Sequence, residues 1–121
     1  MSTPPKILVI DDDEAILDAL DAVLQDEGYQ TDVSTKDGEY VDYVLQRELP
    51  DLIILDILLS GHDGRDICKK IKNDERTSHI PIILMSAHIR GEDAAHQAGA
   101  DAFLAKPFDI NELLDKIARL L

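Results

Sequence analysis

The feature that most constrains the fold of this chain is a regular alternation of short apolar segments with longer amphipathic ones. Five segments read as strands, at residues 7–10, 29–34, 51–56, 80–85 and 101–105. Each is followed by apolar residues at helical spacing, in segments 14–26, 37–47, 65–73, 91–98 and 109–121. Apolar strands joined by helices indicate an α/β fold, with a parallel sheet that is covered on both faces.

The connections between these strands restrict the topology further. Crossovers between parallel strands are right-handed, and the pattern favours a doubly wound, flavodoxin-like sheet of five strands in the order 2-1-3-4-5. The length of 121 residues suits one domain with a sizeable core. No repeat, low-complexity tract or linker divides the sequence, so we expect a single domain over residues 1–121.

Acidic residues gather where two of these strands end. Asp11, Asp12 and Asp13 follow the first strand, and Asp56 ends the third. In a doubly wound sheet, ligands bind beyond the carboxyl ends of the strands, where the strand order reverses. That point lies between the first and third strands, so we expect Asp11, Asp12 and Asp56 to converge there. Asp13 is expected to cap the following helix instead.

Two further polar side chains are expected at the same edge. Ser86 follows the strand at 80–85, and Lys106 follows the strand at 101–105. Crowded carboxylates repel, by about 4 kcal/mol for a pair at ~4 Å and an effective dielectric of about 20, and they are expected to have raised pKa values without a metal. Mg²⁺ suits such a site because it is typically held by one or two carboxylates, waters and phosphate oxygens.

With these residues the chain resembles the receiver domain of two-component response regulators. The resemblance is carried by VIDDDE at 9–14, LIILDILLSGHDG at 52–64, PIILMSAH at 81–88 and GADAFLAKPFD at 99–109. It implies that Asp56 accepts a phosphoryl group, as 4-aspartylphosphate, from a phosphohistidine on a histidine kinase or histidine phosphotransfer protein. The implied role is a phosphoacceptor signalling domain that catalyses only its own phosphorylation and slow dephosphorylation.

The resemblance also implies a metal site. Asp12, Asp56 and the main-chain carbonyl of Leu58 would bind Mg²⁺, and Asp11 would assist through a water. Mn²⁺ would be able to substitute.

Other matching positions imply how the signal is made and passed on. Ser86 would donate a hydrogen bond to a phosphoryl oxygen, and Lys106 would pair with Asp56 or its phosphate. Phe103 stands at the switch aromatic of the family, with a plain core aromatic as the alternative. Pro107 stands at the family's cis peptide bond. An output partner or a second copy is expected to dock on the surface made by segments 91–98, 101–105 and 109–121.

The chain departs from the family pattern in two places. Ser60 replaces a turn proline that usually follows the phosphoacceptor, which is expected to loosen the loop without removing the site. The segment 86–103 is slightly shorter than in many members, and residues 89–91 replace part of a helix. Leu58 and His88 are expected to flank the path of the water that hydrolyses the phosphoryl group, and therefore to set its lifetime.

Composition excludes several other classes of protein. The net charge of −13, from 25 acidic and 12 basic residues, disfavours direct binding of nucleic acid, which needs a basic face. No apolar run approaches the ~20 residues that cross a membrane, and no signal peptide is evident. A cytoplasmic protein is the default expectation. The single cysteine, Cys68, is expected to be a small buried thiol.

Two other functions compete with the phosphoacceptor. A phosphohydrolase of the haloacid-dehalogenase type needs a second Asp two residues after the nucleophile, where this chain has Leu58. A degenerate receiver would act as a binding module without phosphorylation. The complete set of Asp11, Asp12, Asp56, Ser86 and Lys106 argues against that function.

Overall fold

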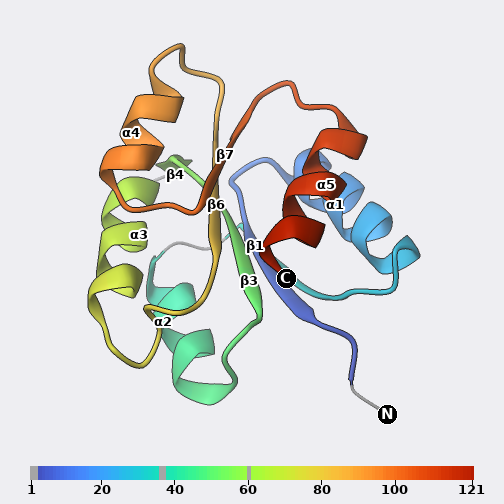
Figure 1. The fold of residues 1–121 in the computed structure, drawn as a ribbon, viewed down its shortest axis with the longest axis horizontal. Helices are drawn as coiled ribbons and strands as arrows, with labels where there is room; N and C mark the ends of the chain where they lie inside the picture. Colours follow the sequence, from blue (N-terminus) through green and yellow to red (C-terminus); the bar gives the residue numbers. More distant parts are fainter. Residues whose placement is uncertain (1–2, 36–37, 60) are drawn as a thin grey trace.

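The computed structural model describes residues 3–35, 38–59 and 61–121. Within them, one parallel sheet has the strand order β2-β1-β3-β6-β7, as predicted (Figure 1). Its strands are β1 (Lys6–Ile10), β2 (Gln30–Ser34), β3 (Leu52–Asp56), β6 (Ile82–Ser86) and β7 (Ala102–Ala105). The helices are α1 (Glu14–Asp26), α2 (Gly38–Arg47), α3 (Gly64–Asn73), α4 (Gly91–Gln97) and α5 (Ile110–Leu120).

The sheet separates two hydrophobic cores, because alternate side chains of a strand point to opposite faces. In β3, Ile53 and Leu55 pack with α2, α3 and α4, whereas Leu52 and Ile54 pack with α1 and α5. Figure 1 shows the same division of helices between the two sides of the sheet. Burial on both faces explains why β1, β3 and β6 read as continuous apolar runs.

The ends of α1 follow from its capping residues. The carboxylate of Asp13 accepts hydrogen bonds from the backbone N–H groups of Ala15 and Ile16, at 2.9 and 3.4 Å, so the predicted cap is confirmed. Gly28 closes the helix with a φ of 93°, and the N–H of Tyr29 donates to the carbonyl of Leu24. Tyr29 therefore belongs to the helix terminus, and β2 begins one residue later than predicted.

The strand predicted from residue 80 begins at Ile82. The N–H of Ile80 closes a turn on the carbonyl of Thr77, at 3.0 Å. Pro81 has no N–H to donate, although its carbonyl accepts a hydrogen bond from Ile53. Ile80 is buried in the core, which explains its apolar signal without making it part of the strand. The predicted start of the second helix, at residue 37, lies outside the described residues.

The segment predicted as a loop around 60–64 contains regular structure on either side of Ser60, which itself lies outside the described residues. Two short strands, β4 (Leu58–Leu59) and β5 (His62–Asp63), form an antiparallel pair. Helix α3 begins immediately afterwards, at Gly64 rather than at Arg65. Asp63 caps it by accepting a hydrogen bond from the N–H of Arg65 at 2.9 Å. The N–H of Gly64 donates to the carbonyl of Ile57 at 2.7 Å, so this hairpin returns the chain to the end of β3.

Candidate functional site

The candidate site lies at the carboxyl edge of the sheet and starts from two neighbouring strands. β1 and β3 are parallel, with Ile10 opposite Leu55, so the residue after Ile10 and the residue after Leu55 reach the same edge. These residues are Asp11 and Asp56, with exposed fractions of only 1% and 8%. The fold therefore brings together two of the carboxylates that the sequence predicted at this point.

Lys106 supplies the cation between these two carboxylates. Its ammonium Nζ lies 2.7 Å from Oδ2 of Asp11 and 3.3 Å from Oδ2 of Asp56. The backbone holds the lysine in place, because its N–H donates to the carbonyl of Ser86 at 2.9 Å. The peptide bond from Lys106 to Pro107 is cis, which confirms that prediction. The ion pair with Asp56 is found, and the closer contact to Asp11 is an addition to what the sequence predicted.

Burial controls the electrostatics of this group. The pKa of Asp56 is raised, first by desolvation and second by the negative charge of Asp11. The charge and hydrogen bond of Lys106 and a backbone hydrogen bond from Leu58 oppose that rise. Burial lowers the pKa of Lys106, but the hydrogen bond and charge of Asp11, followed by the charge of Asp56, raise it overall. The lysine is therefore held in its charged form.

The third predicted carboxylate is arranged differently. Asp12 is exposed, while Asp11 is buried and its Oδ1 accepts a hydrogen bond from the N–H of Asp13 at 2.9 Å. Over residues 3–35, 38–59 and 61–121, no group of three or more His, Cys, Asp or Glu side chains is placed to hold a metal ion. Of the three acids expected to converge, Asp11 and Asp56 are buried together beside Lys106, and Asp12 differs from them in being exposed to solvent.

Ser86 completes the edge from the end of β6. It is 2% exposed, and its Oγ accepts a hydrogen bond from the N–H of His88 at 3.0 Å. Nδ1 of His88 in turn accepts from the N–H of Arg90 at 3.0 Å. A short relay of hydrogen bonds thus connects the hydroxyl of Ser86 to the residue that precedes α4.

A family model, described as the response regulator receiver domain, matches residues 7–118 of this chain. The chain belongs to this family. Its fold is accordingly the flavodoxin-like fold of receiver domains, and the domain is one of two-component signalling.

Relatives and solved structures agree with this assignment. The chain is 40% identical, over 97% of its length, to the DNA-binding dual master transcriptional regulator RpaA of Synechocystis sp. and 36% identical, also over 97%, to the phosphate regulon transcriptional regulatory protein PhoB of Rhizobium meliloti. It covers 49% and 52% of those proteins, about half of their length. The chemotaxis response regulator CheY4 of Vibrio cholerae superimposes with a TM-score of 0.89 at 26% identity, covering 98% of this chain and 100% of that one.

A further solved structure is the signal receiver domain of a histidine kinase from Syntrophus aciditrophicus. It superimposes with a TM-score of 0.88 at 31% identity, covering 97% of this chain and 89% of that one. Among the described residues of the present receiver domain, no helix is both long and apolar enough to cross a membrane.

The receiver domain has a hollow of about 330 Å³ that is lined by Ser86 and by Ile57, the residue after Asp56. Leu58 and His88 both line it, and Leu58 is 71% exposed. The same hollow is lined by Arg65 and Arg90, which the sequence did not single out. Arg65 pairs with Asp63 at its rim.

Two glycines of the receiver domain also escaped the sequence prediction. A Cβ at Gly64 would lie 2.1 Å from the backbone oxygen of Asp56, and one at Gly91 would lie 2.8 Å from Cβ of Ser86. Both glycines therefore permit close packing against the residues of the site. The two glycines themselves were the only signal available in the sequence, and a glycine does not reveal which atoms would approach its Cβ position.

Proposed function

We propose that this receiver domain accepts a phosphoryl group on Asp56 from a phosphohistidine on a histidine kinase or a histidine phosphotransfer protein. The observation that carries the proposal is a buried carboxylate at the end of β3 with the ammonium group of Lys106 3.3 Å away. Such a carboxylate is an oxygen nucleophile at an edge where the fold leaves room for a ligand. Family membership gives the donor class.

The transfer needs a nucleophile, charge neutralisation and positioning. A carboxylate oxygen of Asp56 forms a new P–O bond while the P–N bond to the donor's imidazole breaks. The imidazole leaves with the bonding electrons and takes up a proton. Lys106 offsets the negative charge of the phosphoryl oxygens. After transfer, the hydroxyl of Ser86 donates a hydrogen bond to one of those oxygens.

The donor set fits a bound Mg²⁺. Asp11 and Asp56 are buried carboxylates on neighbouring strands, and Mg²⁺ requires only one or two carboxylates beside waters and phosphate oxygens. Asp12, Asp56 and the carbonyl of Leu58 would hold the ion, and Asp11 would act through a water. When bound, the ion neutralises charge on the transferring group. Mn²⁺ has the same preference for oxygen ligands and would substitute.

The experiment that tests this function is incubation with acetyl phosphate and Mg²⁺, followed by intact mass measurement. The expected result is a slowly decaying adduct of about 80 Da that is lost in Asp56→Asn. Asp51→Asn is the matched control, because Asp51 precedes the amino end of the same strand, whereas Asp56 lies at its carboxyl end.

Other outcomes would assign other functions. An undiminished adduct in Asp56→Asn would refute this phosphoacceptor. Absence of any adduct on the unmodified protein would support a degenerate receiver that binds partners without phosphorylation. Rapid multiple turnover of varied phosphate esters would support a phosphohydrolase.

Phosphorylation is proposed to act on the surface formed by α4, β7 and α5. An output partner or a second copy of the chain would dock there. The same proposal places the protein in the cytoplasm, without direct contact with nucleic acid or membrane.

A further inference from the structure

Gly91 lies where a side chain would not fit. It is buried at the first position of α4. An ideal Cβ at this position would be 2.8 Å from Cζ and 2.9 Å from Cε1 of Phe103, and 2.8 Å from Cβ of Ser86. Gly91 is not among the glycines with positive φ, which are Gly28, Gly61 and Gly99. The glycine is therefore needed for space, not for backbone conformation.

The two groups that border this space differ in their freedom to move. Ser86 is fixed: it is 2% exposed, it ends a central strand, and its carbonyl accepts from Lys106 at 2.9 Å. The ring of Phe103 can rotate, because it is only partly buried. A methyl group at position 91 would thus displace the ring before it displaced the serine.

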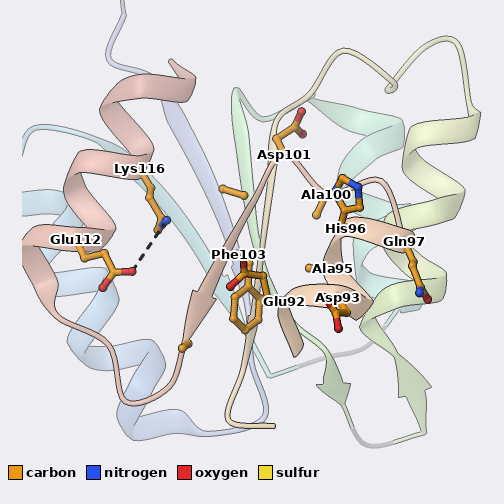
Figure 2. A pocket seen from close by; sticks show the side chains of 12 residues that line it. Glu92, Asp93, Ala95, His96, Gln97, Ala100, Asp101, Phe103, Glu112 and Lys116 are labelled. Atoms are coloured by element: carbon orange, nitrogen blue, oxygen red, sulfur yellow. Dashed lines mark ion pairs between the residues drawn. The ribbon is translucent and has the colours of Figure 1, made fainter. Parts of the chain in front are cut away.

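A hollow next to Phe103 could accommodate the displaced ring. Phe103 lines a hollow of about 480 Å³ between α4, β7 and α5, together with Glu92, Glu112 and Lys116. Figure 2 shows Phe103 among these lining side chains, with the Glu112–Lys116 pair on one side and Asp93 and His96 on the other. A ring that left the neighbourhood of Gly91 would turn into that space and reduce it.

We propose that Gly91 is a positioning residue that holds the ring of Phe103 beside Ser86 and thereby keeps this hollow open. The link to signalling rests on the proposed phosphorylation of Asp56, whereas the position of the ring does not. In Gly91→Ala, the ring moves outward and the docking surface changes shape without any change in the carboxylates.

The test is NMR of the unmodified chain with ¹³C-labelled phenylalanine. The sequence has two phenylalanines, so Phe108→Leu assigns the ring signals. In the wild type we expect nuclear Overhauser contacts from the Phe103 ring to the Hα protons of Gly91 and the Hβ protons of Ser86. In Gly91→Ala the contacts to Ser86 should weaken several-fold. Arg90→Ala, which changes the adjacent residue without filling the space, should retain them. Contacts of wild-type intensity in Gly91→Ala would overturn the proposal.

A double-variant comparison covers the case in which Gly91→Ala is unstable. We expect Gly91→Ala to lower the Tm by about 5 °C or more, and by less than half as much in the Phe103→Ala background. If the single variant fails to fold and the double variant folds, the clash with the ring is supported. The proposal would be overturned if the Tm fell equally in both backgrounds, or if neither variant folded. In either case the glycine would be needed to avoid a clash with Ser86 or the backbone.

Phosphorylation separates this inference from the proposed function. Gly91→Ala should form the adduct on Asp56 with acetyl phosphate, because the atoms nearest to the added Cβ belong to Phe103 and Ser86 and not to Asp11 or Asp56. If the wild type forms no adduct, the proposed function is wrong. The role of Gly91 is then still tested by the nuclear Overhauser contacts between the Phe103 ring and Ser86, because these are measured on the unmodified chain. If the adduct forms and the ring contacts persist in Gly91→Ala, only the inference about Gly91 fails.

Discussion

The ammonium group of Lys106 lies closer to Asp11, at 2.7 Å, than to Asp56, at 3.3 Å. One cation therefore serves two buried carboxylates that arrive from neighbouring strands. Without it, two negative charges would face each other at low solvent exposure, where burial has the highest energetic cost. The lysine is consequently a structural residue of the receiver domain as well as a residue of the proposed reaction.

Lys106→Met is expected to lower the free energy of unfolding by about 3 kcal/mol, because it leaves two buried carboxylates without their cation. Urea denaturation at neutral pH measures the change. Asp11→Asn in the same background should restore part of the loss, since it removes one of the unpaired charges. Lys116→Met is the control: its pair with Glu112 is long, at 4.0 Å, and should contribute about 0.5 kcal/mol or less. Equal losses for the two lysines would contradict this account.

The raised pKa of Asp56 predicts a pH dependence of stability. Desolvation and the charge of Asp11 raise this pKa above its ordinary value, so the folded state binds this proton more tightly than the unfolded state does. The favourable contribution is complete below the unfolded pKa and is lost as pH rises through the folded pKa. Asp56→Asn removes the titration. The stability of the variant relative to the wild type should therefore increase as the pH rises above about 4. Denaturation curves at several pH values test this, and a constant difference would show that Asp56 does not titrate abnormally.

The arrangement of strands could be predicted because β1, β3 and β6 are apolar on both faces and most of the segments between strands have apolar residues at helical spacing. Once the sheet order was known, the positions of Asp11, Asp56, Ser86 and Lys106 at one edge followed from the polarity of parallel strands. The sequence could not distinguish Asp11 from Asp12, since adjacent acids look alike until the backbone directs one inward and the other toward solvent.

The sequence also could not predict short strands or close packing contacts. The pair β4–β5 has two residues in each strand, too few to show a strand period. Gly64 and Gly91 were visible as glycines, but the atoms that would meet a Cβ come from Asp56, Ile57, Ser86 and Phe103. Such contacts depend on tertiary structure, which no local pattern encodes.

Gly64→Ala is expected to be among the most damaging substitutions in the domain. The added Cβ would lie 2.1 Å from the backbone oxygen of Asp56 and 2.8 Å from Cα of Ile57, and backbone atoms cannot rotate away. We expect a loss of about 3 kcal/mol or more, together with a lower yield of the phosphoryl adduct. Gly61→Ala is a control in the same hairpin: it has a φ of 78° and no atom within 4 Å, so its cost should be about 1 kcal/mol. The larger loss in Gly61→Ala would refute the packing argument.

The lifetime of the phosphoryl group is expected to depend on Leu58. This exposed apolar side chain shares a hollow with His88 and offers no hydrogen bond to orient an attacking water. Leu58→Asn supplies an amide and should accelerate loss of the adduct several-fold, as followed by intact mass over time. Ile89→Asn is the matched control, because Ile89 is 95% exposed but does not line this hollow. An unchanged decay rate in Leu58→Asn would show that the residue does not touch the path of the water.

Phosphorylation is expected to reach the surface formed by α4, β7 and α5 through hydrogen bonds that begin at Ser86. The Oγ of Ser86 accepts from the N–H of His88, and Nδ1 of His88 accepts from the N–H of Arg90, which precedes α4. When the hydroxyl turns toward a phosphoryl oxygen on Asp56, the first of these hydrogen bonds is strained and the start of α4 shifts. Phosphorylation can move this equilibrium only by its differential interaction with the two states.

NMR spectra recorded before and after phosphorylation, or with a beryllofluoride mimic, should therefore show shifts that extend from Asp56 through Ser86 to residues 89–108. Ser86→Ala should weaken the shifts in that segment and leave the adduct on Asp56 largely intact, because it removes the hydroxyl but keeps the Cβ that borders Gly91. Ser78→Ala, at an exposed position before β6, should leave the propagation unchanged. Shifts confined to the acidic residues, with the segment 89–108 silent in the wild type, would refute this route of signalling.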